Sequence, residues 1–224
     1  MNSNQFNTSK VRDMMQAIKS RFRLSPQKEL LIPAAYVAGA FILGLIGGAS
    51  ILHTLNPSQL AELRQYLDSI LSNMGALAQN GQFPVIKTWG DSLRGQLYAL
   101  VIMWLMGLTV VGAPLVILLT GARGFILGFT IGFLVQEKAG QGLMLALVAV
   151  LPQNLCYVPG LLVAGTLALY FSLSLFRPSR ETTVFTGILT YTLLFVACAI
   201  LILLGSWIEA YLVPGIIRLT MLIG

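Results

Sequence analysis

Residues 123–176 read RGFILGFTIGFLVQEKAGQGLMLALVAVLPQNLCYVPGLLVAGTLALYFSLSLF, and within them Leu151-Pro152-Gln153-Asn154 lies between two apolar runs. Proline removes a backbone donor and clashes with the carbonyl four residues earlier, so a helix entering this point must kink or stop. In a bilayer, the freed backbone groups are tolerated only where neighbouring helices, side-chain amides or water satisfy them. The stretch therefore predicts an integral membrane protein built around one broken segment, with Gln153 and Asn154 facing protein or a wet cavity.

The composition of the whole chain agrees with a membrane protein. Of the 224 residues, 56% are hydrophobic and 10% are charged, with a mean hydropathy of +0.81. Soluble domains are less apolar and more charged. The net charge is +6, but the basic residues cluster at the ends of apolar runs. That placement is typical of membrane orientation signals and not of nucleic-acid recognition.

The residues that usually carry enzyme chemistry are scarce. Cys156 and Cys198 lie inside apolar runs, where a small hydrophobe is expected and a disulfide framework is not. His53 is the only histidine, which argues against a histidine-rich metal site or a Ser/His/Asp triad. Because paired carboxylates, a Walker loop and a glycine fingerprint are also missing from the sequence, we expect no enzyme activity, no cofactor and no metal.

Residues 1–29 are expected to form a cytoplasmic basic tail, and residues 30–224 a single membrane domain. Residues 11–24 can be written as an amphipathic helix that would lie on the anionic inner leaflet. The alternative is a flexible tail that only fixes the membrane topology.

The apolar runs predict an all-α polytopic protein with about five transmembrane helices. The first span covers residues 30–55 and carries the GxxxG pair Gly44 and Gly48, which would favour a close helix contact. Residues 56–96 are predicted to be an outer loop, in which residues 58–77 have leucines at helical spacing. This amphipathic helix either contacts another protein or rests on the bundle.

The second span is predicted at residues 97–120, bent by Pro114, and a short turn at 121–124 is expected to follow it. The third run places Gly124, Gly128 and Gly132 at four-residue spacing. Such a face favours direct contact with another helix backbone, so self-association as a homo-oligomer is a reasonable expectation.

The fourth run, residues 142–176, would span ~50 Å as a straight helix, against a hydrocarbon core of ~30 Å. We favour a re-entrant segment at 142–151 that dips in from the outer side, followed by a crossing at 155–176. The alternative is one long helix kinked at Pro152. The fifth span covers residues 184–207, which places the amino terminus inside and the carboxyl terminus outside.

Several polar residues near the spans are candidate functional groups. Gln153 and Asn154 either line a cavity that coordinates a substrate or ion, or cap the broken helix ends. Near the outer ends of spans, Glu209 is either an interfacial residue or a buried functional group, and the same holds for Glu137 and Lys138. The aromatic residues Trp207 and Tyr211 suit an interfacial belt.

Three stretches together resemble the stage II sporulation protein M family: residues 128–135 (GFTIGFLV), residues 150–155 (VLPQNL), and Val158 with Pro159. Near the carboxyl end, residues 209–212 with Pro214 are similar to the tail of that family. The likeness extends to the order of segments, which is a basic start, one span, an outer loop and further spans.

The resemblance implies a non-catalytic membrane scaffold of the sporulation engulfment machinery. Such a scaffold would localise peptidoglycan hydrolases, the stage II sporulation proteins D and P, at the septal and engulfing membrane of the mother cell. Protein B is implied as a recruiting factor, and membrane lipids as surroundings. The residues alone leave open a permease-like subunit, with a translocation or lipid-binding cavity at the broken helix.

Overall fold

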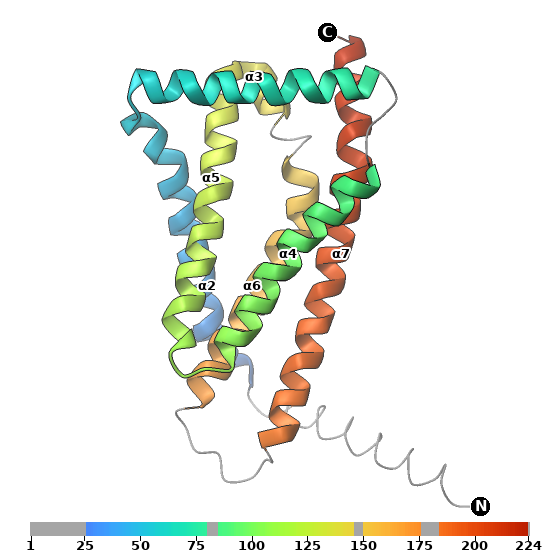
Figure 1. The fold of residues 1–224 in the computed structure, drawn as a ribbon. Coiled ribbons are helices and arrows are strands. Elements are labelled where there is room, and N and C mark those ends of the chain that lie inside the picture. The colour runs from blue at the N-terminus through green and yellow to red at the C-terminus, as the bar shows by residue number, and fades with distance from the viewer. Residues whose placement is uncertain (1–25, 80–84, 146–149, 176–183, 224) are drawn as a thin grey trace, which may run out of the picture.

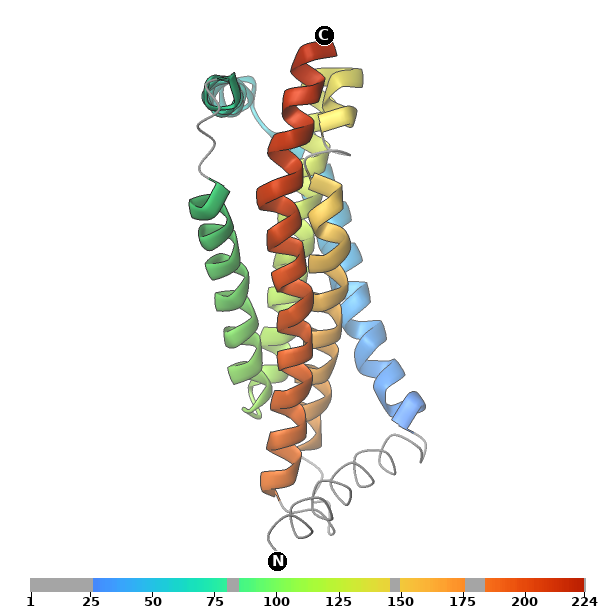
Figure 2. The same cartoon turned by 90° about the vertical axis from the view of Figure 1, so that its right-hand side faces the viewer.

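The computed structural model describes residues 26–79, 85–145, 150–175 and 184–223, and all of its regular elements there are helical. The elements are α2 (Pro26–Ser50), the 3-10 helix η1 (Ile51–Thr54), α3 (Pro57–Gln79), α4 (Val85–Gly107), α5 (Gly112–Leu145), α6 (Leu151–Ser174) and α7 (Val184–Ile223). Figure 1 shows α3 lying across one end of a bundle formed by the other long helices. Figures 1 and 2 show that α4 and α6 run in the opposite direction to α2, α5 and α7.

Four of the described helices are long and apolar enough to cross a membrane. The corresponding spans are Glu29–Thr54, Gly112–Gln136, Leu151–Ser174 and Gly187–Tyr211. Helix α4 is not among them, because its first half carries the exposed charged residues Lys87, Asp91 and Arg94. The prediction of an all-α polytopic membrane protein is confirmed.

Helix α6 lies at the centre of the bundle, and it is the most buried of the four spans. Its residues Ala164 and Ala168 are fully buried in a core that also contains Val37 of α2, Met103 of α4 and Val116 of α5. The outward faces carry large exposed apolar side chains, among them Leu43, Leu118 and Leu155. In a bilayer these side chains contact lipid, which is as apolar as leucine.

Glycines bring the backbones of α2 and α5 into direct contact. A Cβ atom at Gly48 would collide with the carbonyl oxygen of Phe125, and one at Gly44 would collide with α5 one turn away. In the same way, Cβ atoms at Gly124 or Gly128 would collide with carbonyl oxygens of α2. The glycine face of α5 is thus covered by α2 of the same chain. Self-association stays a prediction and would need another face.

The chain reverses direction at residues 108–111, so the predicted second span over 97–120 is wrong. Thr109 begins a run of β-branched residues, which lose side-chain freedom in a helix. Its backbone N–H donates to the Met106 carbonyl (3.0 Å) and closes the turn. Gly112 follows, where a Cβ would collide with that carbonyl. Pro114 lies in the first turn of α5, where its missing N–H costs nothing, so it does not bend a span.

The turn predicted at residues 121–124 is also wrong, because these residues lie inside α5. Their glycines serve the contact with α2 instead of a turn. Since α5 begins at Gly112 and continues to Leu145, the third run is long enough to cross a bilayer. Arg123 consequently lies near the middle of the span Gly112–Gln136.

Pro152 lies in the first turn of α6. Because α5, which ends at Leu145, and α6 run in opposite directions (Figure 1), the alternative of one long helix over 142–176 kinked at Pro152 is wrong. Residues 142–145 form the end of α5, so the re-entrant segment predicted at 142–151 is wrong in its first part. Its residues 146–149 lie outside the described residues.

The remaining boundaries differ less from the sequence predictions. The first span is confirmed by α2 together with η1. The amphipathic helix predicted at 58–77 is confirmed by α3. Helix α4 already begins at Val85, so the loop predicted to reach residue 96 ends earlier. Helix α7 continues beyond residue 207 to Ile223. The tail at residues 1–25 lies outside the described part of the chain.

Candidate functional site

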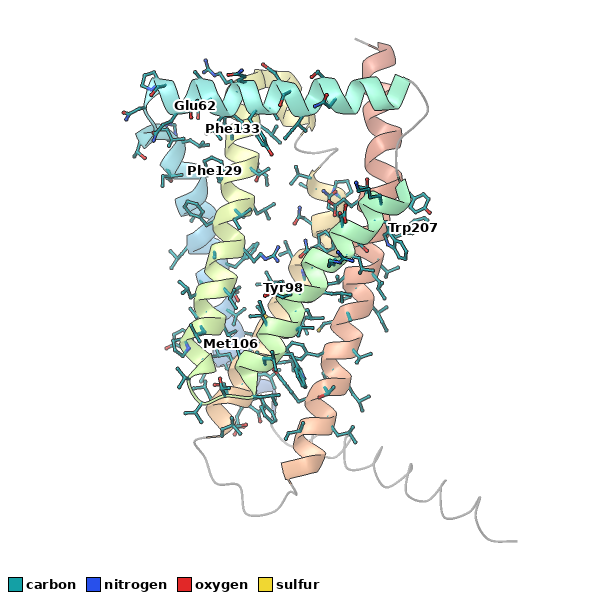
Figure 3. The ribbon with its side chains drawn as sticks, in the orientation of Figure 1. Glu62, Tyr98, Met106, Phe129, Phe133 and Trp207 are labelled. Atoms are coloured by element: carbon teal, nitrogen blue, oxygen red, sulfur yellow. The ribbon has the colours of Figure 1, made fainter. Side chains whose placement is uncertain are left out.

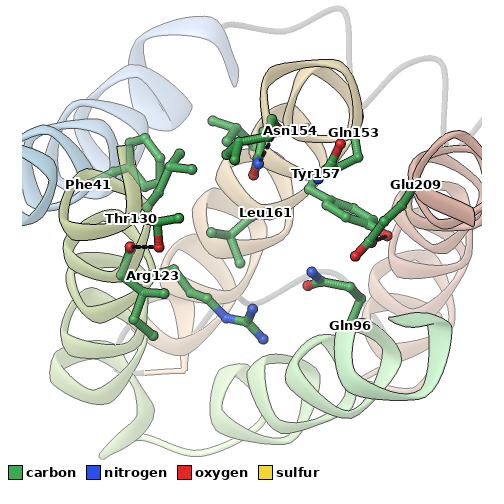
Figure 4. Close-up of a pocket in the computed structure, with 13 residues that line it drawn as sticks. Phe41, Gln96, Arg123, Thr130, Gln153, Asn154, Tyr157, Leu161 and Glu209 are labelled. Atoms are coloured by element: carbon green, nitrogen blue, oxygen red, sulfur yellow. Dashed lines mark hydrogen bonds between the residues drawn. The ribbon is translucent and has the colours of Figure 1, made fainter. Parts of the chain in front are cut away.

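A cavity of about 270 Å³ lies between the helices of the bundle. Its polar lining comes from several helices: Gln96 of α4, Arg123 and Thr130 of α5, Gln153, Asn154 and Tyr157 of α6, and Glu209 of α7. Figure 4 shows that Gln96, Arg123 and Glu209 project from different helices towards a common space. A cavity this large far exceeds the ~15 Å³ that a single water needs, so the bundle has room for a polar ligand.

Arg123 is the cation of this cavity. It lies near the middle of a 25-residue span, where a charged side chain is costly and marks a functional site by default. Its side chain is half-buried, and none of the described residues accepts a hydrogen bond from its guanidinium or pairs with it.

Glu209 is the anion of the same cavity. The hydroxyl of Tyr157 donates a hydrogen bond to its Oε2 atom over 2.8 Å, and Tyr157 itself is buried. This bond ties α6 to α7 inside the bundle. The carboxylate keeps further acceptor positions, because each of its oxygens carries two lone pairs.

The amides after Pro152 lie at the start of α6 and in the cavity. The Nδ2 atom of Asn154 donates to the Val150 carbonyl over 2.7 Å, which is a local bond within the first turn of α6. Gln153 is buried, with 9% of its surface exposed. Both side chains also line the cavity.

The other predicted residues lie elsewhere. Gly124 and Gly128 lie at the contact between α2 and α5, and Gly132 lies next to Ala49 of α2. The ring of Tyr211 stacks on that of Trp207 at 5.3 Å, with both side chains about half exposed. The side chains of Glu137 and Lys138 lie outside the described residues.

Arg123, Gln96 and Tyr157 also belong to this site, although none of them was predicted as a site residue from the sequence. The signal for Arg123 was its position in an otherwise apolar run, but the surrounding glycines led to the wrong prediction of a turn. Gln96 was assigned to the end of a loop. Among the described residues, no group of three or more His, Cys, Asp and Glu side chains is placed to hold a metal ion.

The bundle, its exposed apolar surface and its polar cavity define a polytopic helical membrane protein with polar side chains in its interior. Residues 23–214 match the family model of stage II sporulation protein M. The match covers most of the chain, so the chain belongs to this family, as the resemblance indicated. No curated protein and no solved structure gives a significant match.

Proposed function

We propose that this protein is a non-catalytic membrane scaffold of the sporulation engulfment machinery. In this role it localises the peptidoglycan hydrolases, stage II sporulation proteins D and P, at the septal and engulfing membrane. Membership of the family supports a sporulation-related membrane protein. The observation that supports a scaffold is α3, a long helix that lies across one end of the bundle instead of inside it (Figure 1).

Helix α3 has one face turned to the rest of the protein and one face turned away from it. Leu60, Leu63 and Leu67 recur at helical spacing and are half-buried. On another face, Tyr66 is 68% exposed, and Glu62 is exposed as well (Figure 3). An exposed aromatic beside a charge suits a protein contact, because tyrosine is enriched where proteins bind one another.

We infer that α2, α4, α5, α6 and α7 each cross the membrane, with the start of α2 inside the cell. The start of α2 and the end of α6 lie at the same end of the bundle (Figure 1). In the sequence, basic residues adjoin both positions: Lys28 near the start of α2, and Arg177 and Arg180 after α6. Positive residues favour the cytoplasmic side. This orientation puts α3 on the outer side, where it faces the cell wall.

Co-purification of proteins D and P with the full chain tests the proposal. The substitutions Tyr66→Ala and Glu62→Lys should each reduce recovery of the hydrolases several-fold, because both alter the exposed face of α3. Tyr98→Ala is the matched control, since Tyr98 lies on α4 and is 69% exposed, like Tyr66. It should leave recovery unchanged.

Failure of the wild-type chain to retain either hydrolase would contradict the scaffold. Unchanged recovery with both α3 variants would contradict the assignment to α3. Transport of a solute by the purified protein in liposomes, without partners, would favour the permease-like alternative. Cleavage of peptidoglycan by the purified chain would contradict a non-catalytic role.

A further inference from the structure

The cavity holds two opposite charges that do not pair with each other. Glu209 accepts its hydrogen bond from Tyr157, whereas Arg123 has no ion pair or hydrogen bond with any residue that the structure describes. In an apolar surrounding, two such charges attract strongly. A polar group placed between them would contact both charges at once.

The cavity is also open on one side. Ile126 lines it, and 60% of the surface of this residue is exposed. Leu127, Val158 and Leu161 add apolar lining beside the polar groups. A ligand with an apolar tail can thus keep that tail in the bilayer while its polar end lies between the helices.

The charges define the chemistry of the polar end. A guanidinium binds phosphate through two parallel hydrogen bonds, and Gln96 beside it in Figure 4 can donate another from its amide. The carboxylate of Glu209 requires a cationic donor. Because Arg123 and Glu209 together carry no net charge, a zwitterion is buried between them without adding an uncompensated charge.

We propose that this cavity binds the phosphoethanolamine head group of a zwitterionic phospholipid. The phosphate contacts Arg123 and Gln96, the ammonium donates to Glu209, and the acyl chains leave past Ile126. Phosphatidylcholine fits less well, because its quaternary ammonium has no hydrogen to donate. The proposal does not depend on the scaffold function, and its test uses the purified chain without partners.

Native mass spectrometry of the full-length protein tests the proposal with three phospholipids of identical acyl chains. The wild type should retain phosphatidylethanolamine at least ~10-fold better than phosphatidylcholine, the size expected for a charge-assisted hydrogen bond. Arg123→Gln should reduce retention of phosphatidylethanolamine and phosphatidylglycerol at least ~10-fold, since both need the phosphate contact. Arg94→Gln is the control, because it removes the same charge from an exposed position on α4.

Glu209→Gln tests the proposal through a change of lipid preference, which misfolding would not produce. The substitution keeps an acceptor for Tyr157 but leaves the cavity with a net positive charge. The preference should therefore shift from phosphatidylethanolamine to the anionic phosphatidylglycerol. An unchanged preference in this variant would overturn the proposal.

Two further results would overturn it. One is equal retention of phosphatidylethanolamine and phosphatidylcholine by the wild type. The other is thermal stabilisation by soluble glycerophosphoethanolamine that equals stabilisation by the lipid, because the ligand would then be a soluble phosphate ester.

Discussion

The contact between α2 and α5 makes a sharp prediction for two adjacent glycines. A Cβ at Gly48 would lie 2.8 Å from the carbonyl carbon of Phe125 and 2.8 Å from the nitrogen of Phe129. Non-bonded carbon atoms prefer separations of about 3.5 Å or more, so Gly48→Ala must push the helices apart by roughly 1 Å. A Cβ at Gly47 meets only the flexible ring of Phe125, at 3.9 Å.

Both substitutions replace glycine by alanine within α2 and so gain the same helix propensity. The difference between their Tm values therefore measures the cost of packing the added Cβ at Gly48. Overpacking of this kind costs about 1–3 kcal/mol, which corresponds to a Tm difference of roughly 2–12 °C for a chain of this size. Gly48→Ala should melt lower than Gly47→Ala by that amount, and Gly47→Ala should match or slightly exceed the wild type. Thermal unfolding of the purified proteins in one detergent, followed by tryptophan fluorescence, measures the difference. A Gly48→Ala protein that melts at or above the temperature of Gly47→Ala would refute the direct backbone contact.

Two hydrogen bonds between elements give further predictions. Tyr157→Phe removes the donor to Glu209 and should lower the free energy of unfolding by about 1–3 kcal/mol, measured as a lower Tm; an unchanged Tm would show that the bond does not hold α6 to α7. Ser172→Ala removes a 2.7 Å bond to the carbonyl of Thr109 in the turn between α4 and α5, and should cost about 1 kcal/mol. Ser174→Ala is its control, because the hydroxyl of Ser174 bonds to the carbonyl of Phe171 in its own helix; equal Tm values for the two variants would contradict a role of Ser172 in holding the turn.

The helices that lie next to a polar segment could be predicted from the sequence. The first span ends where polar residues begin, and α3 follows as a run with leucines on one face. Its boundaries, Pro57–Gln79, lie within a few residues of the predicted helix. Hydropathy and helical periodicity carry this information directly.

The reversal at residues 108–111 was not visible to hydropathy, because the apolar run continues through it. Because the second span was predicted to continue to residue 120, the next turn was predicted at residues 121–124. Arg123 was therefore placed in a turn. A glycine can mark either a turn or a close helix contact, and only the neighbouring helix decides which one. Here the neighbouring helix is α2, about 80 residues earlier in the chain, and its contact with α5 shows that these glycines serve helix packing.

The polar cavity could not be assembled from the sequence at all. Arg123 and Glu209 belong to different helices, and neither shows in its local pattern that it faces the other. The sequence did single out Gln153, Asn154 and Glu209 as separate candidates. Their meeting with Arg123 follows from the packing of α4, α5, α6 and α7 around one space (Figure 4).

The localisation of fluorescent fusions to stage II sporulation proteins D and P in sporulating cells tests the scaffold most directly. In cells that lack this protein, both hydrolases should lose their position at the septal membrane, and expression of the wild-type chain should restore it. If both hydrolases gather at the septum equally well without the protein, the scaffold account is contradicted.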